Sequence, residues 1–302
     1  MKRTNIVATK SFQDLCPDIL VRIFMTLNVV NLVVVSMVCK SWNVASRDAT
    51  LWYKINLTRM SSPWFNIPKI LNAWSDRYLR ARMARFLKYV LHLSNSKTNC
   101  LIFNSYVQLN DKLLILAAQR TPNLKRLVLS ESGHLSKRGI DLAMASWGGL
   151  QSITITSMLK DNHFFSAMGK VCKNITEVKF TCSFEEHHAD DLIKYTPGLK
   201  ALSIRNQMVN RDALFRVLDC LQHLEVVNVC HSLFWDTTSD LEGCDIYVHH
   251  KNLHVSWLGK IISCEKKICI MCNKVSNNTM REQPYDPLEE LWSQDEIPSL
   301  SY

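Results

Sequence analysis

A group of cysteines and histidines near the C-terminus has the residue types that bind zinc. The group consists of Cys264, Cys269 and Cys272, with Cys244, His249, His250 and His254 upstream as a possible fourth ligand. A structural zinc ion takes four thiolate or imidazole ligands in a tetrahedron. Because the gap before Cys269 is long and no second Cys-x-x-Cys is present, the sequence favours thiols that pack as small apolar residues. We therefore expect no bound metal.

A second cluster could support acid-base or metal chemistry. Residues 185–191 read Glu-Glu-His-His-Ala-Asp-Asp, which combines carboxylates with imidazoles. The same residue types are favoured where a polar connection leads into a helix, because the helix N-terminus attracts negative charge. No Gly-x-Ser-x-Gly, phosphate-binding loop or His-Glu-x-x-His accompanies the cluster. The sequence thus predicts a helix start here, no catalytic residue, no cofactor and no enzymatic activity.

Composition indicates an ordinary folded protein. The chain has 302 residues, 47% of them hydrophobic, and can bury a large core. No apolar run reaches the roughly 18 residues of a membrane span, and Met1–Ser11 lacks the apolar stretch of a signal peptide. Its 11 cysteines, an odd number, indicate reduced thiols rather than a disulfide framework. We expect a soluble protein of the cytoplasm or nucleus with no membrane partner.

The net charge of +9 does not by itself indicate a nucleic-acid partner. The positive residues are spread along the chain, and only Asp76–Lys88 is locally basic. Apolar residues interleave with the basic ones in that segment, as on an amphipathic helix with one solvated face. We therefore expect no nucleic-acid binding.

Short helices are expected at the N-terminus. From Leu15 to Leu27 the apolar residues recur with the spacing of one helix face, and Pro17 suits a first helical turn. A second apolar stretch, Leu32–Val38, leads into Val-Cys-x-x-Trp at residues 38–42, and Leu51-Trp52 follows after a polar turn. The pattern predicts three short helices with two large aromatic anchors.

These N-terminal features resemble the F-box family, which has a leucine-rich first helix, then Val-Cys-x-x-Trp and then Leu-Trp. One departure is Cys16, which occupies the usual proline position and is followed by Pro17. The resemblance implies docking on a Skp-family adaptor and, through it, on a cullin ubiquitin ligase. The adaptor-binding residues that it implies are Leu15, Pro17, Ile19, Leu20, Ile23, Phe24, Leu27, Val38, Cys39, Trp42 and Trp52.

A repeat occupies the middle of the chain. Five segments share a Leu-x-x-Leu-x-Leu shape, and their starts are separated by 26, 25, 24 and 25 residues. The segments begin at Leu124, Leu150, Ile175, Leu199 and Leu224. Helical patterns lie between them, as parallel strands joined by crossovers require. Self-similarity at this period predicts a solenoid in which Leu127, Ile153, Val178, Leu202 and Val227 form one buried ladder.

The linking sequences resemble the cysteine-containing leucine-rich repeats found behind F-boxes. The clearest instance runs from Leu109-Asn110-Asp111 to Thr121-Pro122-Asn123-Leu124. The cysteine or asparagine that usually follows each strand is replaced by Ser132, Met158, Ser183, Gln207 and Ser232. The repeats are therefore degenerate, and their backbone ladder must be closed in another way. A doubly wound α/β domain is the structural alternative, which the regular period argues against.

Alternation along each strand predicts which residues line the concave face. This face is mixed, with hydroxyls and isolated charges, and suits a protein ligand better than a small molecule. The candidate target-binding residues are Arg126, Val128, Ser152, Thr154, Glu177, Lys179, Ser203, Arg205 and Asn228. For any single position, a merely solvated strand residue is the plainer interpretation.

The sequence predicts an α/β protein with an N-terminal three-helix F-box and a short leucine-rich-repeat solenoid, parallel strands concave and helices convex. The predicted regions are 11–56 F-box, 57–98 helical linker, 99–232 repeats, 233–274 C-terminal cap and 275–302 flexible acidic tail. Residues 282–302 carry six acidic residues and no Lys or Arg. This tail could fold back on the repeats or serve as a peptide ligand, and the sequence leaves both open.

The chain looks most like the plant F-box/leucine-rich-repeat proteins. That resemblance implies a substrate receptor that docks on a Skp adaptor and holds an unknown protein target for ubiquitination by a cullin ligase. Two alternatives remain: a scaffold whose F-box is vestigial, and a receptor that needs a small molecule. The short arc and the absence of a Lys and Arg cluster on the concave face argue against the last.

Overall fold

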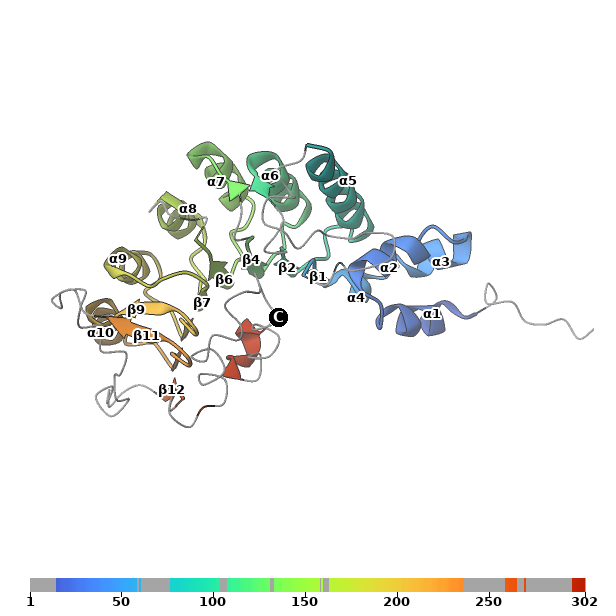
Figure 1. The fold of residues 1–302 in the computed structure, drawn as a ribbon. Coiled ribbons are helices and arrows are strands. Elements are labelled where there is room, and N and C mark those ends of the chain that lie inside the picture. The colour runs from blue at the N-terminus through green and yellow to red at the C-terminus, as the bar shows by residue number, and fades with distance from the viewer. Residues whose placement is uncertain are drawn as a thin grey trace, which may run out of the picture.

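The computed structural model describes residues 15–58, 60, 77–103, 108–130, 133–157, 159, 163–235, 259–264, 269 and 295–301. These residues form an arc of parallel strands with helices on its outer side and a group of short helices at its N-terminal end (Figure 1). Within the described residues, no helix is both long enough and apolar enough to cross a membrane.

The helices are short at the N-terminus and longer in the arc. They are α1 (Pro17–Phe24), α2 (Val29–Val35), α3 (Lys40–Ala45), α4 (Ala49–Trp52), α5 (Arg77–Leu93), α6 (Asp111–Arg120), α7 (Lys137–Met144), α8 (His163–Val171), α9 (Glu186–Tyr195), α10 (Arg211–Cys220) and the 3-10 turn η5 (Pro298–Leu300). The helices α6 to α10 lie between successive strands of the repeat, as the sequence predicts. Side chains cap several of them, since Asn110, Ser136 and Asn210 each accept a hydrogen bond from a first-turn N–H.

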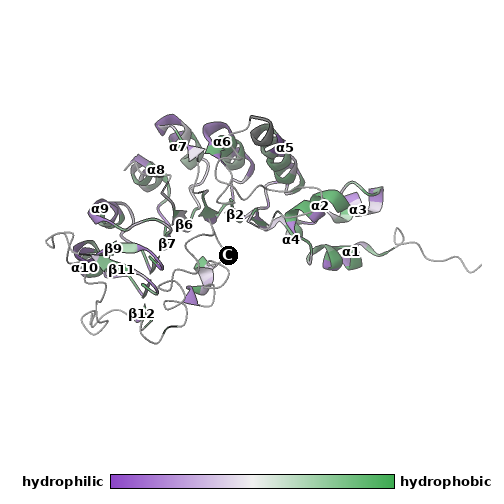
Figure 2. Cartoon of the chain, in the orientation of Figure 1, coloured by the Kyte–Doolittle hydropathy of each residue, from purple (hydrophilic) through white to green (hydrophobic). Residues whose placement is uncertain are grey.

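The N-terminal helices enclose a small aromatic centre. Pro17 lies in the first turn of α1, and the Asn28 side chain caps α2. Phe24 and Trp42 meet edge to face with ring centroids 5.5 Å apart. Trp52 is buried, and its indole N–H donates to the backbone oxygen of Ser46 at 2.6 Å. Figure 2 shows hydrophobic colour along much of α1 and α2, in keeping with their apolar sequences.

One parallel sheet of eight strands follows the inner side of the arc, in the order β1-β2-β4-β6-β7-β8-β10-β12. Its strands are β1 (Lys54–Asn56), β2 (Cys100–Ile102), β4 (Arg126–Val128), β6 (Ser152–Ile155), β7 (Glu177–Phe180), β8 (Ala201–Ser203), β10 (Val226–Asn228) and β12 (Lys260–Ile262). Short parallel pairs join β3 (Leu109–Asn110) to β5 (Gly133–His134), and β9 (Met208–Asn210) to β11 (Leu233–Trp235). Within the eight-stranded sheet, each strand thus pairs with the sheet strand of the neighbouring repeat, as in a solenoid.

The predicted buried ladder is confirmed. Residues in register along the sheet are Ile55, Leu101, Leu127, Ile153, Val178, Leu202, Val227 and Ile261. All of them except Ile261 are buried, and they belong to one continuous core with the N-terminal helices. The helices α5 to α10 lie on the convex side only (Figure 1). A doubly wound sheet would carry helices on both faces, so the fold is a leucine-rich-repeat solenoid.

The solenoid begins earlier than the sequence analysis expects. Strand β1 follows α4 directly and pairs with β2, so residues 54–56, at the end of the predicted F-box region, also form part of the sheet. Helix α5, in the segment taken as a linker, lies beside α6 in the row of convex helices (Figure 1). The long segment between β1 and β2 breaks the period, which is why the repeat pattern missed this first unit.

Hydroxyl groups replace the missing cysteine and asparagine ladder. Thr156 donates to the carbonyl of Ser130 at 2.9 Å, and Ser232 donates to the carbonyl of Ile204 at 2.7 Å. These two bonds each join a strand end to the neighbouring repeat and satisfy a buried backbone acceptor. Of the positions where the sequence lacks the usual residue, Ser232 therefore has a direct role, whereas Ser132 and Met158 lie outside the described residues.

Candidate functional site

The N-terminal helices expose an unusual number of large apolar side chains. Those exposed are Ile19, Ile23, Met25, Val34, Met37, Val38, Val44 and Tyr53, and we call them the N-terminal apolar surface. They come from α1, from α2 and the turn after it, from α3, and from the end of α4. Exposed apolar groups that gather in one small module are typical of a protein-binding face. This surface therefore has the composition of a docking site.

The structure divides the predicted adaptor-binding residues into three groups. Pro17, Ile19, Ile23 and Val38 are exposed, whereas Leu15, Leu27, Cys39 and Trp42 are half-buried. Leu20, Phe24 and Trp52 are each 1% exposed and form the core of the module instead. The sequence analysis missed Met25, Val34, Met37, Val44 and Tyr53. Helical spacing gave no signal for this division, because Ile19 with Ile23 and Leu20 with Phe24 both repeat at four residues.

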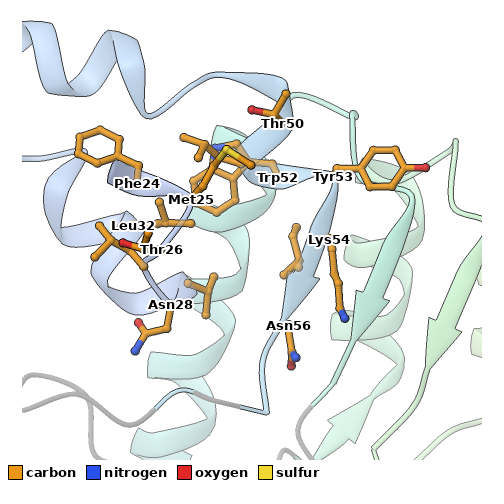
Figure 3. Close-up of a pocket in the computed structure, with 14 residues that line it drawn as sticks. Phe24, Met25, Thr26, Asn28, Leu32, Thr50, Trp52, Tyr53, Lys54 and Asn56 are labelled. Carbon is orange, nitrogen blue, oxygen red and sulfur yellow. The ribbon is translucent and has the colours of Figure 1, made fainter. Parts of the chain in front are cut away.

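A hollow of about 470 Å³ opens between α1, α2, α4 and β1 (Figure 3). Its wall combines apolar Phe24, Leu32 and Trp52 with the polar side chains of Asn28 and Asn56. Met25 and Tyr53 also line it, and both belong to the N-terminal apolar surface. The N-terminal apolar surface thus borders a recess large enough to hold a side chain.

The concave face of the solenoid is covered by the last described residues of the chain. Of the predicted target-binding residues, Val128, Ser152, Thr154, Lys179, Ser203, Arg205 and Asn228 are buried, and Arg126 and Glu177 are half-buried. Residues 295–301, which include η5, lie inside the arc, where Figure 1 marks the C-terminus. Ile297 and Leu300 pack on Ala201 of β8. In contrast to the flexible tail that the sequence predicts, this stretch is a packed part of the repeat domain.

Glu296 is the centre of that contact. Its Oε2 lies 3.0 Å from the Lys179 ammonium and 3.2 Å from Nε of Arg205, and all three side chains are almost fully buried. Its Oε1 accepts hydrogen bonds from Ser203 Oγ at 2.7 Å and Asn228 Nδ2 at 3.0 Å. Three strands of the solenoid, β7, β8 and β10, contribute to this one carboxylate, with Arg205 following β8. The predicted concave residues are therefore brought together, with a segment of the same chain as their partner.

Electrostatics explain why this carboxylate is stable inside the protein. Burial alone would raise the pKa of Glu296, but the charges of Lys179 and Arg205 and the hydrogen bond from Ser203 hold that pKa below its usual value. At the N-terminal side of the sheet, Arg126 donates to the backbone carbonyls of Ser299 and Ser301. Basic groups along the concave face thus bind residues 295–301 in two ways, through the Glu296 carboxylate and through backbone carbonyls.

The segment 185–191 forms the first turns of α9, as the sequence predicts. His188 completes a capping box, because its Nδ1 accepts the backbone N–H of Glu185 at 3.1 Å. Burial, with the charge of His187 nearby, lowers the pKa of His188 to about 4. Burial also raises the pKa of Asp191 to about 6. His188 packs against Phe180 and thus serves the fold.

Two of the predicted zinc-site cysteines, Cys264 and Cys269, lie close to His231, which was not among the predicted ligands. Cys264 and Cys269 both approach His231, and Cys230 adjoins Cys264. A hydrogen bond from the Cys230 thiol, with contacts to His231, lowers the pKa of Cys264 against the effect of burial. The same hydrogen bond, together with burial, raises the pKa of Cys230. Burial would lower the pKa of His231, but Cys264 and Asp295 outweigh it and raise that pKa.

The remaining zinc-site candidates, Cys244, His249, His250, His254 and Cys272, lie outside the described residues. The absence of a metal therefore stays a prediction of the sequence analysis.

Known proteins resemble this chain along nearly its whole length. Residues 12–58 match the F-box-like family. The F-box/LRR-repeat protein At3g48880 of Arabidopsis thaliana is 32% identical over 96% of this chain and 96% of its own length. The putative F-box protein At4g11580 of the same plant is 25% identical, again over 96% of each chain. Putative F-box/LRR-repeat protein 22 of Arabidopsis thaliana is 22% identical over 77% of this chain and 73% of its own. With its helical N-terminal module and its repeat solenoid, the chain belongs to the F-box/leucine-rich-repeat proteins.

Proposed function

We propose that this protein is the substrate-recognition subunit of a Skp-cullin-F-box ubiquitin ligase. The observation that supports the proposal is the N-terminal apolar surface, which lies within the residues that match the F-box-like family. A free module of this size gains nothing from exposing isoleucine, methionine and valine, whereas a partner that covers them gains about 25 cal/mol for each Å² buried. The partner is a Skp-family adaptor, which connects the chain to a cullin.

Docking uses the outward face of α1 and the residues that follow α2. Ile19 and Ile23 stand one helical turn apart on α1, and Val38 precedes α3. Leu20 and Phe24, on the other face, hold the module together and contribute to docking only by positioning α1. The chain itself acts as a non-catalytic subunit, and the transfer of ubiquitin takes place elsewhere in the complex.

The solenoid presents the target on its concave side. Lys179 and Arg205 already bind the carboxylate of Glu296 there, so a target that uses these residues must replace residues 295–301. Replacement without leaving the two cations unpaired requires a carboxylate on the target. The target segment is therefore acidic, and the residues nearest to it are Arg126, Lys179, Ser203, Arg205 and Asn228.

The test is co-purification of the adaptor and cullin with the full chain and with Ile19→Ser/Ile23→Ser. Loss of two large apolar side chains from the interface should remove about 3 to 6 kcal/mol, or roughly two to four powers of ten in affinity. The matched control is Leu142→Ser on α7, because Leu142 is 49% exposed and Ile19 is 48% exposed.

Undiminished adaptor binding by the double variant would contradict the proposal. Recovery of the adaptor without a cullin would instead favour the scaffold function. Ile19 and Ile23 suit this test better than Leu20, because Leu20→Ala would also disturb the core of the module.

A further inference from the structure

Two cysteines occupy equivalent places at the ends of neighbouring strands. Strand β10 pairs in parallel with β12, with Asn228 opposite Ile262. Cys230 and Cys264 each lie two residues beyond these partners. Adjacent strands run about 4.8 Å apart, so the two thiols arrive side by side at the same edge of the sheet. Cys230 and Cys264 are brought together by the pairing of β10 with β12, which are separated by a long stretch of sequence. Their spacing in the sequence therefore does not predict the contact.

His231 turns toward the same point. Its backbone has a φ of 61°, in the left-handed region, directly after Cys230. Its Nδ1 lies 3.3 Å from Cys264 Sγ and 3.7 Å from Cys269 Sγ. The ligand atoms of Cys230, His231 and Cys264 all lie within 4.8 Å of one another. Two thiols and one imidazole nitrogen thus converge at one place, and the Cys269 thiol lies next to that nitrogen.

The two distances from His231 Nδ1 to sulfur agree with the sulfur–nitrogen edges of a zinc tetrahedron. With Zn–S near 2.3 Å and Zn–N near 2.1 Å, the edge between a sulfur and a nitrogen ligand is about 3.6 Å. The two distances from the His231 nitrogen bracket this value. Three cysteines with one histidine form a common structural zinc set.

The surroundings of the cluster also match those of a metal-binding histidine. The other ring nitrogen of His231, Nε2, lies 3.2 Å from a carboxylate oxygen of Asp295. A carboxylate in this position fixes the orientation of the ring, with Nδ1 directed at the thiols. The backbone N–H of His231 donates to Cys264 Sγ at 3.3 Å, which stabilises sulfur in the thiolate form. His231 itself is buried, so the imidazole is held away from bulk water.

We propose that Cys230, His231, Cys264 and Cys269 bind one structural zinc ion. The site joins the end of β10 to the chain that follows β12, where the solenoid has no further covering repeat among the described residues. Through Asp295 it also holds the segment that carries Glu296 onto the concave face. Four protein ligands leave no open position on zinc, so the site has no hydrolytic role.

The first experiment measures zinc in the full chain purified under reducing conditions without added metal. Elemental analysis should find about one zinc per chain, and replacement of zinc by Co²⁺ should give the absorption of a tetrahedral thiolate site. Both measurements use the unaltered protein, so they do not depend on whether a variant folds. Zinc well below one per chain with no binding of added Co²⁺ would overturn the proposal, as would a Cys230–Cys264 disulfide in the reduced preparation.

Variants then identify the ligands. Cys230→Ser and Cys269→Ser should each lose most of the zinc. Cys172→Ser is the matched control, because Cys172 is also a buried solenoid cysteine, with its thiol bonded to the Trp147 carbonyl at 3.2 Å. Asp295→Asn should retain the site but weaken zinc binding about 10- to 100-fold. Full zinc content and unchanged affinity in Cys230→Ser would exclude the assigned ligand set.

Discussion

In two regions of the molecule the usual rule, apolar side chains buried and charged side chains exposed, does not hold. At the N-terminus, Ile19, Ile23 and Val38 are exposed, whereas on the concave face Lys179, Arg205 and Glu296 are buried. No side chain of the described chain covers these exposed apolar groups, whereas the buried Lys179 and Arg205 pair with Glu296. The difference is in keeping with the proposal that a separate protein covers the helical module, whereas residues 295–301 already neutralise the charges of the concave face.

The largest effect on stability is expected when the buried Lys179 and Arg205 lose the carboxylate of Glu296. Glu296→Ala would leave Lys179 and Arg205 buried without a counter-charge, which should lower the free energy of unfolding by about 3 to 5 kcal/mol. Urea denaturation measures the change. Glu225→Ala is the control, since the Lys200–Glu225 pair at 2.7 Å is exposed on both sides and should cost less than about 1 kcal/mol.

Equal effects of Glu296→Ala and Glu225→Ala would mean that residues 295–301 do not occupy the concave face in solution. In that case the concave cations would be solvated rather than buried, as the N-terminal apolar groups are.

A smaller effect on the free energy of unfolding is expected when the pH is lowered. The folded-state pKa of His188 is about 4, below its ordinary 6.5. Between these values the unfolded chain binds a proton that the folded chain does not, so stability is lost as pH falls from about 6.5 to 4. The loss assigned to His188 should be about 2 to 3 kcal/mol. Asp191 acts in the opposite direction, because its raised pKa of about 6 stabilises the folded state as pH falls below that value.

The contribution of His188 to the pH dependence of stability is therefore obtained by comparing the unaltered protein with a variant that lacks this imidazole. In urea unfolding at pH 7 and pH 4.5, the unaltered protein should lose about 2 to 3 kcal/mol more stability on acidification than His188→Gln does, because the Asp191 effect is common to both. His223→Gln, at an exposed position, should leave the dependence unchanged. A pH dependence that His188→Gln does not alter would show that this imidazole is accessible to protons in the folded protein.

The smallest effect is expected at the N-terminal apolar surface. Ile23→Ser with Val38→Ser should change the stability of the free chain by no more than about 0.5 kcal/mol per site, because neither side chain is buried. Phe24→Ala, one residue from Ile23, should cost about 3 to 5 kcal/mol. Thermal unfolding of the free chain separates the two cases, and a large loss from the exposed pair would indicate that this surface is already covered.

Local periodicity in the sequence predicted most of the elements that carry the site. The period near 25 residues placed Leu127, Val178 and Val227 in one ladder, and the structure buries all three. The same alternation placed Lys179 and Ser203 on the concave side, where Glu296 meets them. The helical spacing in α1 was recognised, but it could not distinguish Ile19 and Ile23 from Leu20 and Phe24, because both pairs repeat at four residues.

The sequence alone thus determined the helical module, the solenoid and the direction in which each strand faces, because these follow from side-chain periods of 3.6 and 2 residues. The tertiary structure decided which groups meet. Ser203 and Glu296 are 93 residues apart in the chain, and Cys230 reaches Cys264 only through the pairing of β10 with β12. Such contacts depend on how a long loop closes and on which strand is the neighbour, and both are set by burial of the common core.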